Sequence, residues 1–130
     1  MLRQIVYVST AARLSEADLA DILDSANRNN AQHRITGFLL YNERNFLQLV
    51  EGEPGDLRVL MQKLYKDTRH SGIVVLEDNP IAERAFPDWH MEHLSWATKM
   101  AERREMLEAG IDRLADPRIR QTVLNFASLN

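Results

Sequence analysis

The sequence predicts an α+β domain in which two helices alternate with β-strands. Short stretches rich in β-branched residues have the pattern of strands, two longer stretches repeat apolar residues at helical spacing, and polar turn residues separate them. With 130 residues, of which 45% are hydrophobic and 27% are charged, the chain has the size of one globular domain with a core of ordinary size.

Strands are predicted in five segments of the chain. These segments are residues 3–9, 34–42, 45–52, 72–79 and 89–96. A short polar turn separates the second segment from the third, so these two form a hairpin. The fourth and fifth are joined by the irregular sequence PIAERAFPD.

Helices are predicted in the two long segments between these strands. In residues 14–30, Ser15 is the expected N-cap with Asp18 three residues on, and the apolar stripe consists of Leu19, Ile22, Leu23 and Ala26. Pro54 begins the second helix, whose apolar positions are Leu57, Leu60, Met61 and Leu64. The resulting order, β-α-β-β-α-β with an extra strand, predicts a ferredoxin-like sheet with both helices on one face.

The remaining segment, residues 97–130, is predicted to form two helices, broken near Gly110 and at Asp116-Pro117. Helices on one face of the sheet would leave the other face bare at Val6, Val8, Leu47 and Leu49. We expect this tail to cover that face in its own subunit or in a partner's, and we expect a homo-oligomer. The apolar positions that motivate both expectations are Ile119, Val123, Leu124 and Phe126.

Composition argues against several classes of protein. The chain has no cysteine, which removes disulfides, zinc-thiolate sites and cysteine nucleophiles. Its start lacks the charged and long apolar regions of a signal peptide, so we expect a cytoplasmic protein that does not span a membrane. A net charge of −3 with scattered Lys and Arg disfavours direct nucleic-acid binding.

Gln48 stands out because it lies between Phe46 and Val50 on one side of its predicted strand. Burying an amide without partners costs roughly 1–3 kcal/mol, so Gln48 needs a defined partner. By the same alternation Tyr7 and Trp89 would share the helix-covered side with it. Any one of these three is more often an ordinary satisfied core residue, but together they place a phenol, an amide and an indole where a plain core holds aliphatic side chains.

Five blocks of the sequence resemble the BLUF family of blue-light sensors that use flavin. The blocks are IVYVS, RNNAQHRITGFLLYN, FLQLVEGE, KDTRHSGIVVLE and RAFPDWHM, in that order. The resemblance covers residues 2–96. It implies a flavin-binding photosensor domain of the short stand-alone type at residues 1–96, followed by a helical extension at residues 97–130.

The resemblance also implies which residues form the site. Tyr7 and Gln48 match the family's tyrosine and glutamine, and Trp89 and Met91 match the tryptophan and methionine of its last strand. The ring of FAD, or of FMN or riboflavin, would lie between the two helices with its polar edge at Asn29 and Asn30. The other implied contacts are Ile22, Leu23, Leu64, Lys63, Asp67, Arg69 and His70.

Three residues depart from the family's pattern. Arg34 stands before ITG where glycine is usual, which affects the turn into the second strand. Lys63 replaces a frequent arginine and so keeps the charge without the bidentate fork. His90 stands where serine is common, and alternation points it away from the pocket.

The implied function is that of a photosensor and not of an enzyme. An excited oxidised flavin is a one-electron oxidant, Tyr7 would give an electron and a proton, and the Gln48 amide could hold two hydrogen-bond patterns. No net reaction occurs, and the slightly red-shifted product would signal to a separate, unidentified partner protein. The alternative is a ferredoxin-like enzyme or ligand-binding module without photoactivity.

Two further motifs have simpler interpretations. In HMEH, alternation places His90 and His93 on opposite faces of a strand, which argues against a metal site. Glu51 and Glu53 flank Gly52 at a strand end, and we expect them to be solvent or turn residues and not a catalytic dyad. Trp96 is expected to pack under the tail.

Overall fold

The computed structural model describes residues 1–11, 15–41, 44–67, 70–95, 108–114 and 116–128. Its elements are β1 (Leu2–Ala11), α1 (Glu16–Gln32), β2 (Thr36–Tyr41), β3 (Asn45–Gly52), α2 (Pro54–Lys66), β4 (His70–Ile81), β5 (His90–Ser95) and α4 (Pro117–Ser128). Residues 108–112 are also helical. The predicted order of strands and helices is therefore confirmed for these elements.

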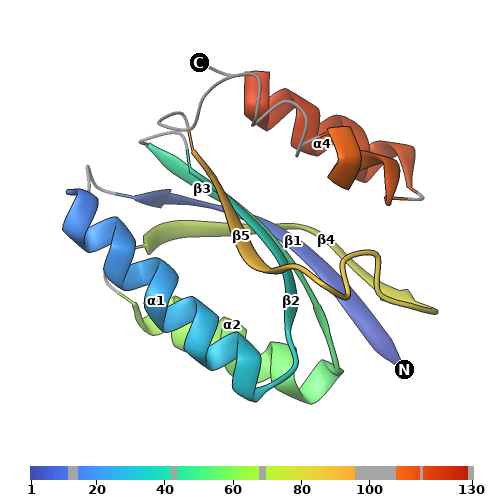
Figure 1. Ribbon diagram of the computed structural model, residues 1–130, viewed down its shortest axis with the longest axis horizontal. Coiled ribbons are helices and arrows are strands. Elements are labelled where there is room, and N and C mark those ends of the chain that lie inside the picture. The colour runs from blue at the N-terminus through green and yellow to red at the C-terminus, as the bar shows by residue number, and fades with distance from the viewer. Residues whose placement is uncertain (12–14, 42–43, 68–69, 96–107, 115, 129–130) are drawn as a thin grey trace.

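The strands form one sheet in the order β4-β1-β3-β2-β5. The first four are antiparallel neighbours, and β5 joins the β2 edge in parallel orientation. Figure 1 shows α1 and α2 together on one side of the sheet and α4 on the other side. The α+β prediction is confirmed, and β1 and β3 are the central strands on which both layers rest.

Local sequence accounts for the start of both helices under the sheet. Ser15 caps α1: its hydroxyl accepts a hydrogen bond from the Asp18 amide at 3.1 Å, and the Asp18 carboxylate accepts one from the Ser15 amide at 3.3 Å. Pro54 occupies the first turn of α2, where its missing N–H costs no helical hydrogen bond. The Ser15 cap and the start of the second helix at Pro54 were both predicted from the sequence.

The helix-covered face holds one of the two apolar clusters. Its buried members are Ile5, Ile22, Ile35, Leu39, Tyr41, Phe46, Val50, Leu57 and Leu60. Phe46 and Val50 lie on this face as alternation predicted, so the side chain between them, Gln48, also points toward α1 and α2.

The opposite face is covered by the chain's own tail. The second cluster joins strand residues to the tail: Val6, Phe38, Leu40, Leu47, Leu49, Phe86, Leu114, Ile119, Val123 and Phe126. Leu124 is the exception among the predicted tail positions, because it is exposed. Since the remaining tail positions bury their side chains within this chain, they no longer argue for a homo-oligomer, which stays a prediction.

Two positions at the start of β2 have unusual backbone conformations. Arg34 has φ of 53°, in the left-handed region that glycine adopts without penalty, so the arginine found before ITG bears a backbone cost there. Gly37 has φ of 143°, and its amide donates a hydrogen bond to the Trp89 carbonyl at 2.9 Å. The chain thus enters β2 through a strained turn.

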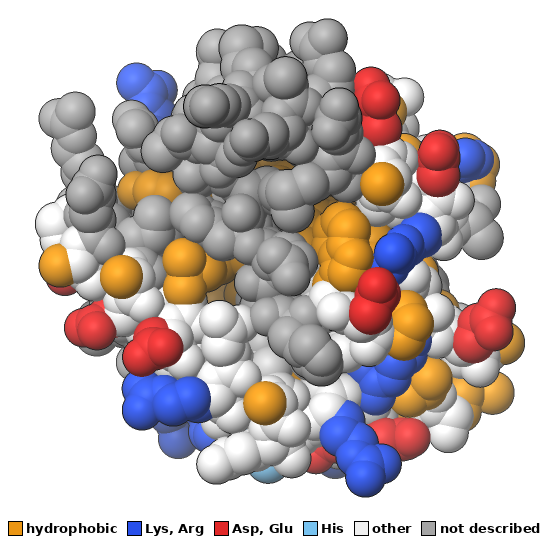
Figure 2. Space-filling model, viewed as in Figure 1, with side chains coloured by type: hydrophobic (Ala, Val, Ile, Leu, Met, Phe, Trp, Pro, Cys, Tyr) orange, Lys and Arg blue, Asp and Glu red, His pale blue; other side chains and the backbone are white. Residues whose placement is uncertain are grey.

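Acidic and basic side chains lie interspersed over the described part of the face drawn in Figure 2. This agrees with the scattered charges of the sequence, and the described residues on that face form no basic stripe. Among the residues described, no helix has the length and apolar character needed to cross a membrane.

Candidate functional site

Tyr7 and Gln48 form the centre of the site. They are register partners on the central strands β1 and β3, and both are buried, with exposures of 1% and 4%. The Tyr7 hydroxyl donates a hydrogen bond to Gln48 Oε1. The buried Gln48 amide therefore has the hydrogen-bond partner that was expected from its position. Because Oε1 is the acceptor, Nε2 of Gln48 is the donor end of the amide.

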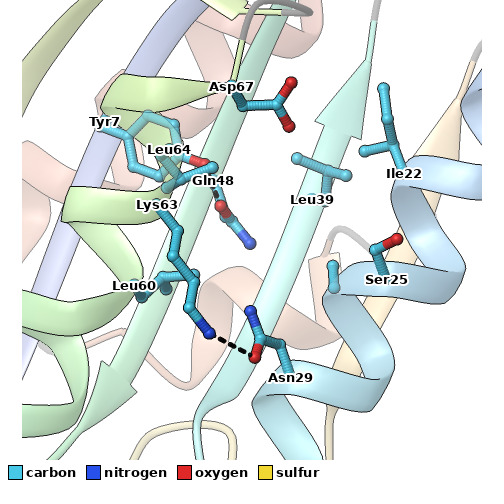
Figure 3. Close-up of a pocket in the computed structure, with 11 residues that line it drawn as sticks. Tyr7, Ile22, Ser25, Asn29, Leu39, Gln48, Leu60, Lys63, Leu64 and Asp67 are labelled. Carbon is cyan, nitrogen blue, oxygen red and sulfur yellow. Dashed lines mark hydrogen bonds between the residues drawn. The ribbon is translucent and has the colours of Figure 1, made fainter.

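This pair lies at the base of a pocket of about 220 Å³ between α1, α2 and the sheet. The lining residues are Tyr7, Ile22, Ser25, Ala26, Asn29, Leu39, Gln48, Leu60, Lys63, Leu64 and Asp67. In Figure 3 the amide nitrogens of Gln48 and Asn29 point into the same space. A pocket with apolar walls and a few directed polar groups is typical of a small-molecule or cofactor site.

Seven of the predicted site residues line this pocket. They are Tyr7, Ile22, Asn29, Gln48, Lys63, Leu64 and Asp67. Four further lining residues were not predicted from the sequence: Ser25, Ala26, Leu39 and Leu60. Helical spacing from Ile22 points to Ser25 and Ala26, whereas Leu39 could be found only from the strand register that places it beside Gln48.

Lys63 connects the two helices across the pocket. Its Nζ donates a hydrogen bond to Asn29 Oδ1 at 3.0 Å, as the dashed line in Figure 3 marks. Because this bond occupies the Asn29 carbonyl oxygen, the amide nitrogen of Asn29 is the end directed into the pocket.

Asn30 follows Asn29 on α1 and is fully buried, with an exposure of 1%. Neither Nδ2 nor Oδ1 of its side chain has a hydrogen-bond partner among the described residues. An unsatisfied buried amide costs about 1–3 kcal/mol, so a polar group that bound beside Asn30 would recover this free energy.

The protonation state of Tyr7 follows from its surroundings. Burial raises the pKa of the Tyr7 phenol far above its usual value, and the negative charge of Asp67 raises it further. The phenol is therefore neutral at physiological pH, and its proton stays on the hydroxyl that faces Gln48.

Of four other predicted site residues, only Leu23 has a described side chain, and it is not among the lining residues. Leu23 packs partly buried against the helix-side cluster. Arg69 lies outside the described residues, and of His70 and Met91 only the backbone is described. Their expected contacts stay predictions, as does the packing of Trp96, which also lies outside the described part of the chain.

The expected placement of Trp89 is wrong. Trp89 packs with the tail-side cluster, 5.0 Å from Phe86 and 6.1 Å from Phe38 between ring centroids, on the face opposite to Gln48. Alternation does not apply to it because β5 begins only at His90, and the Trp89 amide instead closes a turn on the Phe86 carbonyl. The Trp89 indole therefore lies outside the pocket.

Comparison with known proteins identifies the class. The chain belongs to the BLUF family, described as sensors of blue-light using FAD, whose pattern it matches over residues 2–92. Photoactivated adenylate cyclase subunit alpha of Euglena gracilis is 35% identical over 103 residues, which is 75% of this chain and 10% of that protein. This chain therefore spans about a tenth of the length of that relative.

Solved structures agree with this assignment. The dark-state structure of the BLUF protein BlrB has a TM-score of 0.72 and 30% identity, and the match covers 94% of each chain. Klebsiella pneumoniae BlrP1 with FMN and cyclic diGMP has a TM-score of 0.80 and 26% identity over 98% of this chain and 35% of that chain. The chain is thus similar to a blue-light flavin photoreceptor along nearly its whole length.

The residues of the pocket fit a flavin ring. Ile22, Leu39, Leu60 and Leu64 would supply apolar surface for the ring faces. Asn29 and Gln48, which line the pocket, and the buried Asn30 beside Asn29 would supply amide groups for its polar edge. A ring carrying carbonyl and nitrogen acceptors would offer hydrogen-bond acceptors to the amide nitrogens of Asn29 and Gln48.

Proposed function

We propose that this blue-light sensor switches through Tyr7 and Gln48, with the flavin held between α1 and α2. The observation that carries the proposal is the buried hydrogen bond from the Tyr7 hydroxyl to Gln48 Oε1 at the base of the pocket. Asn29 and Asn30 would hold the polar edge of the ring, and Lys63 would fix Asn29 in place through its 3.0 Å hydrogen bond.

Tyr7 is proposed as the donor of an electron and a proton. A bound oxidised flavin, once excited by blue light, supplies a one-electron oxidant at this site. The neutral Tyr7 phenol is the oxidisable side chain of the pocket lining, and its proton has a defined acceptor in Gln48 Oε1. A phenol that has lost an electron is strongly acidic, so the proton would leave along this bond.

Gln48 is proposed as the element that stores the change. Its amide offers an acceptor at Oε1 and a donor at Nε2, so rotation or tautomerisation reverses the pattern that it presents to Tyr7 and to the pocket. When the electron and the proton return to Tyr7, no net reaction has occurred. The rearranged amide is then the remaining difference between dark and lit states, as signalling requires.

The difference spectrum after blue illumination tests this proposal. The wild-type protein should purify yellow and show a reversible red shift of its flavin absorption. Tyr7→Phe, which removes only the hydroxyl, should bind flavin without a red shift. Gln48→Leu, which removes both hydrogen-bonding ends, should do the same with slightly displaced dark absorption.

Tyr41 provides a matched control. It is also buried on the helix-covered face, where it stacks on Phe46 at 4.7 Å, but it does not line the pocket. Tyr41→Phe should keep the full red shift. A normal reversible red shift in both Tyr7→Phe and Gln48→Leu would refute the assigned roles, and a colourless protein that takes up no flavin would favour the alternative of a module without photoactivity.

We further propose that the chain catalyses no reaction of its own and signals by contact with a separate protein partner. The absence of a net change in the Tyr7 and Gln48 scheme supports this proposal, because such a scheme leaves a conformational difference as its product. Light scattering coupled to gel filtration, in the dark and under blue light, tests both the expected homo-oligomer and any light-dependent assembly.

A further inference from the structure

Glu51 is a fully buried carboxylate on β3, three residues beyond Gln48. The expectation that it is a solvent or turn residue is wrong. Its Oε1 accepts hydrogen bonds from Gln4 Nε2 and from the Ala85 amide, each at 3.0 Å, and its Oε2 accepts one from the Phe86 amide at 3.2 Å. Sequence position could not show this, because one donor lies on β1 and the other two in the segment after β4, all more than thirty residues away along the chain.

These contacts attach the segment between β4 and β5 to the strand that carries Gln48. Two consecutive backbone amides bond the two oxygens of one carboxylate, and Arg84 Nη1 adds a hydrogen bond of 2.9 Å to the Glu51 carbonyl. Burial raises the pKa of the Glu51 carboxyl, whereas the three donors and the charge of Arg84 act in the opposite direction. The arrangement is therefore specific for a group with two acceptor oxygens.

The attached segment in turn supports the tail. Phe86 is fully buried and packs against Trp89, and the Arg113 guanidinium lies 5.2 Å from the Trp89 ring centroid. Arg113 also pairs with Asp88 at 2.7 Å. At Gly110 an added Cβ would lie only 3.0 Å from the Trp89 ring, so the helical residues 108–112 lie close against the indole.

We propose that Glu51 is a positioning residue that couples the Gln48 strand to the C-terminal helices through the segment 84–89. The proposal rests on the photoswitch proposed above and extends it to the opposite face of the sheet. A change in the hydrogen bonds of Gln48 shifts β3, Glu51 moves the Ala85 and Phe86 amides with it, and the rings of Phe86 and Trp89 transmit the shift to residues 108–126. The coupling element is a continuous set of contacts.

Hydrogen exchange of the flavin-loaded protein, in the dark and under blue light, tests this coupling. We expect light to change exchange in residues 108–126 of the wild type. Glu51→Gln keeps the size of the side chain but leaves one of the two loop amides without an acceptor. It should retain the full red shift while the light-induced change in the tail falls about threefold or more. Glu53→Gln, which removes the same charge at an exposed neighbouring position, should match the wild type.

A second variant distinguishes the effect of the carboxylate charge from that of side-chain length. Glu51→Asp keeps the carboxylate but is one methylene shorter, so it should also lose the tail response while keeping the red shift. An unchanged tail response in both variants would overturn the proposal, and so would a wild type whose tail does not respond. Loss of the red shift in both variants would also overturn the proposal, because Glu51 would then act in the pocket itself. Loss of folding in both variants would overturn it too, because Glu51 would then be purely structural. A wild type without any red shift would instead refute the photoswitch itself.

Discussion

Gly37 offers the sharpest test of how the sheet is built. It lies in β2 with φ of 143°, and its register partner in β3 is Val50. A Cβ at this position would lie 1.8 Å from the Leu49 carbonyl oxygen, 2.8 Å from its carbonyl carbon and 3.3 Å from the Val50 Cα. All three are backbone atoms of a central strand, so no side-chain rotation can relieve the overlap.

The cost of Gly37→Ala has two parts. Holding a residue with a Cβ in this φ region costs about 1–3 kcal/mol. Relieving the contact also requires β2 and β3 to separate, since 1.8 Å is about half of an ordinary contact distance for a Cβ atom. We expect a loss above about 3 kcal/mol, a large fraction of the 5–15 kcal/mol by which domains are normally stable.

Urea denaturation followed by circular dichroism measures this loss, with Gly55→Ala as the matched control. Gly55 lies in the first turn of α2, and a Cβ there would meet nothing within 4 Å. The same added methyl group should be neutral or stabilise by up to about 1 kcal/mol. A Gly37→Ala protein within about 1 kcal/mol of the wild type would show that the close approach of β2 and β3 is not as described.

Four further outcomes are expected. Arg34→Gly should raise the free energy of unfolding by up to about 1 kcal/mol, because glycine adopts the left-handed backbone freely; a lower urea midpoint would contradict this. Because burial raises the pKa of Tyr7, the phenol ionises in the unfolded chain before it ionises in the folded protein as the pH rises above about 10. In urea titrations above that pH, the free energy of unfolding of the wild type should therefore fall by about 1.4 kcal/mol per pH unit more than that of Tyr7→Phe. Asn30→Leu should stabilise the flavin-free protein by about 1–3 kcal/mol in thermal unfolding, because it removes a buried amide without partners. The same variant should bind flavin more weakly in a fluorescence titration, and tighter binding would exclude Asn30 from the site. Deleting residues 98–130 should expose the tail-side face of the sheet and cause aggregation in light scattering, and a monodisperse, photoactive truncation would argue against the tail as a cover.

Most of the site is predictable because its signals are local. Inside a strand the side chains alternate, so the sequence alone places Gln48 on the same face as Phe46 and Val50. Helical spacing in α1 likewise places Ile22 on the apolar stripe that faces the pocket, whereas Asn29 was expected there only from the family resemblance. What these patterns cannot supply is the register between strands, which sets Tyr7 opposite Gln48 and Leu39 beside it.

The sequence by itself determined the types and order of the elements, the cap of α1 and the proline that begins α2, and the presence of a phenol and an amide on one face of the sheet. Only the tertiary structure decided the position of Trp89, because its face is set by a turn and by the hydrogen bond to Gly37 and not by alternation. It also decided that Glu51 is buried, since a carboxylate can leave water only where distant amides satisfy it. Local periodicity shows which way a side chain points, but burial of a polar group depends on partners that only the folded chain brings together.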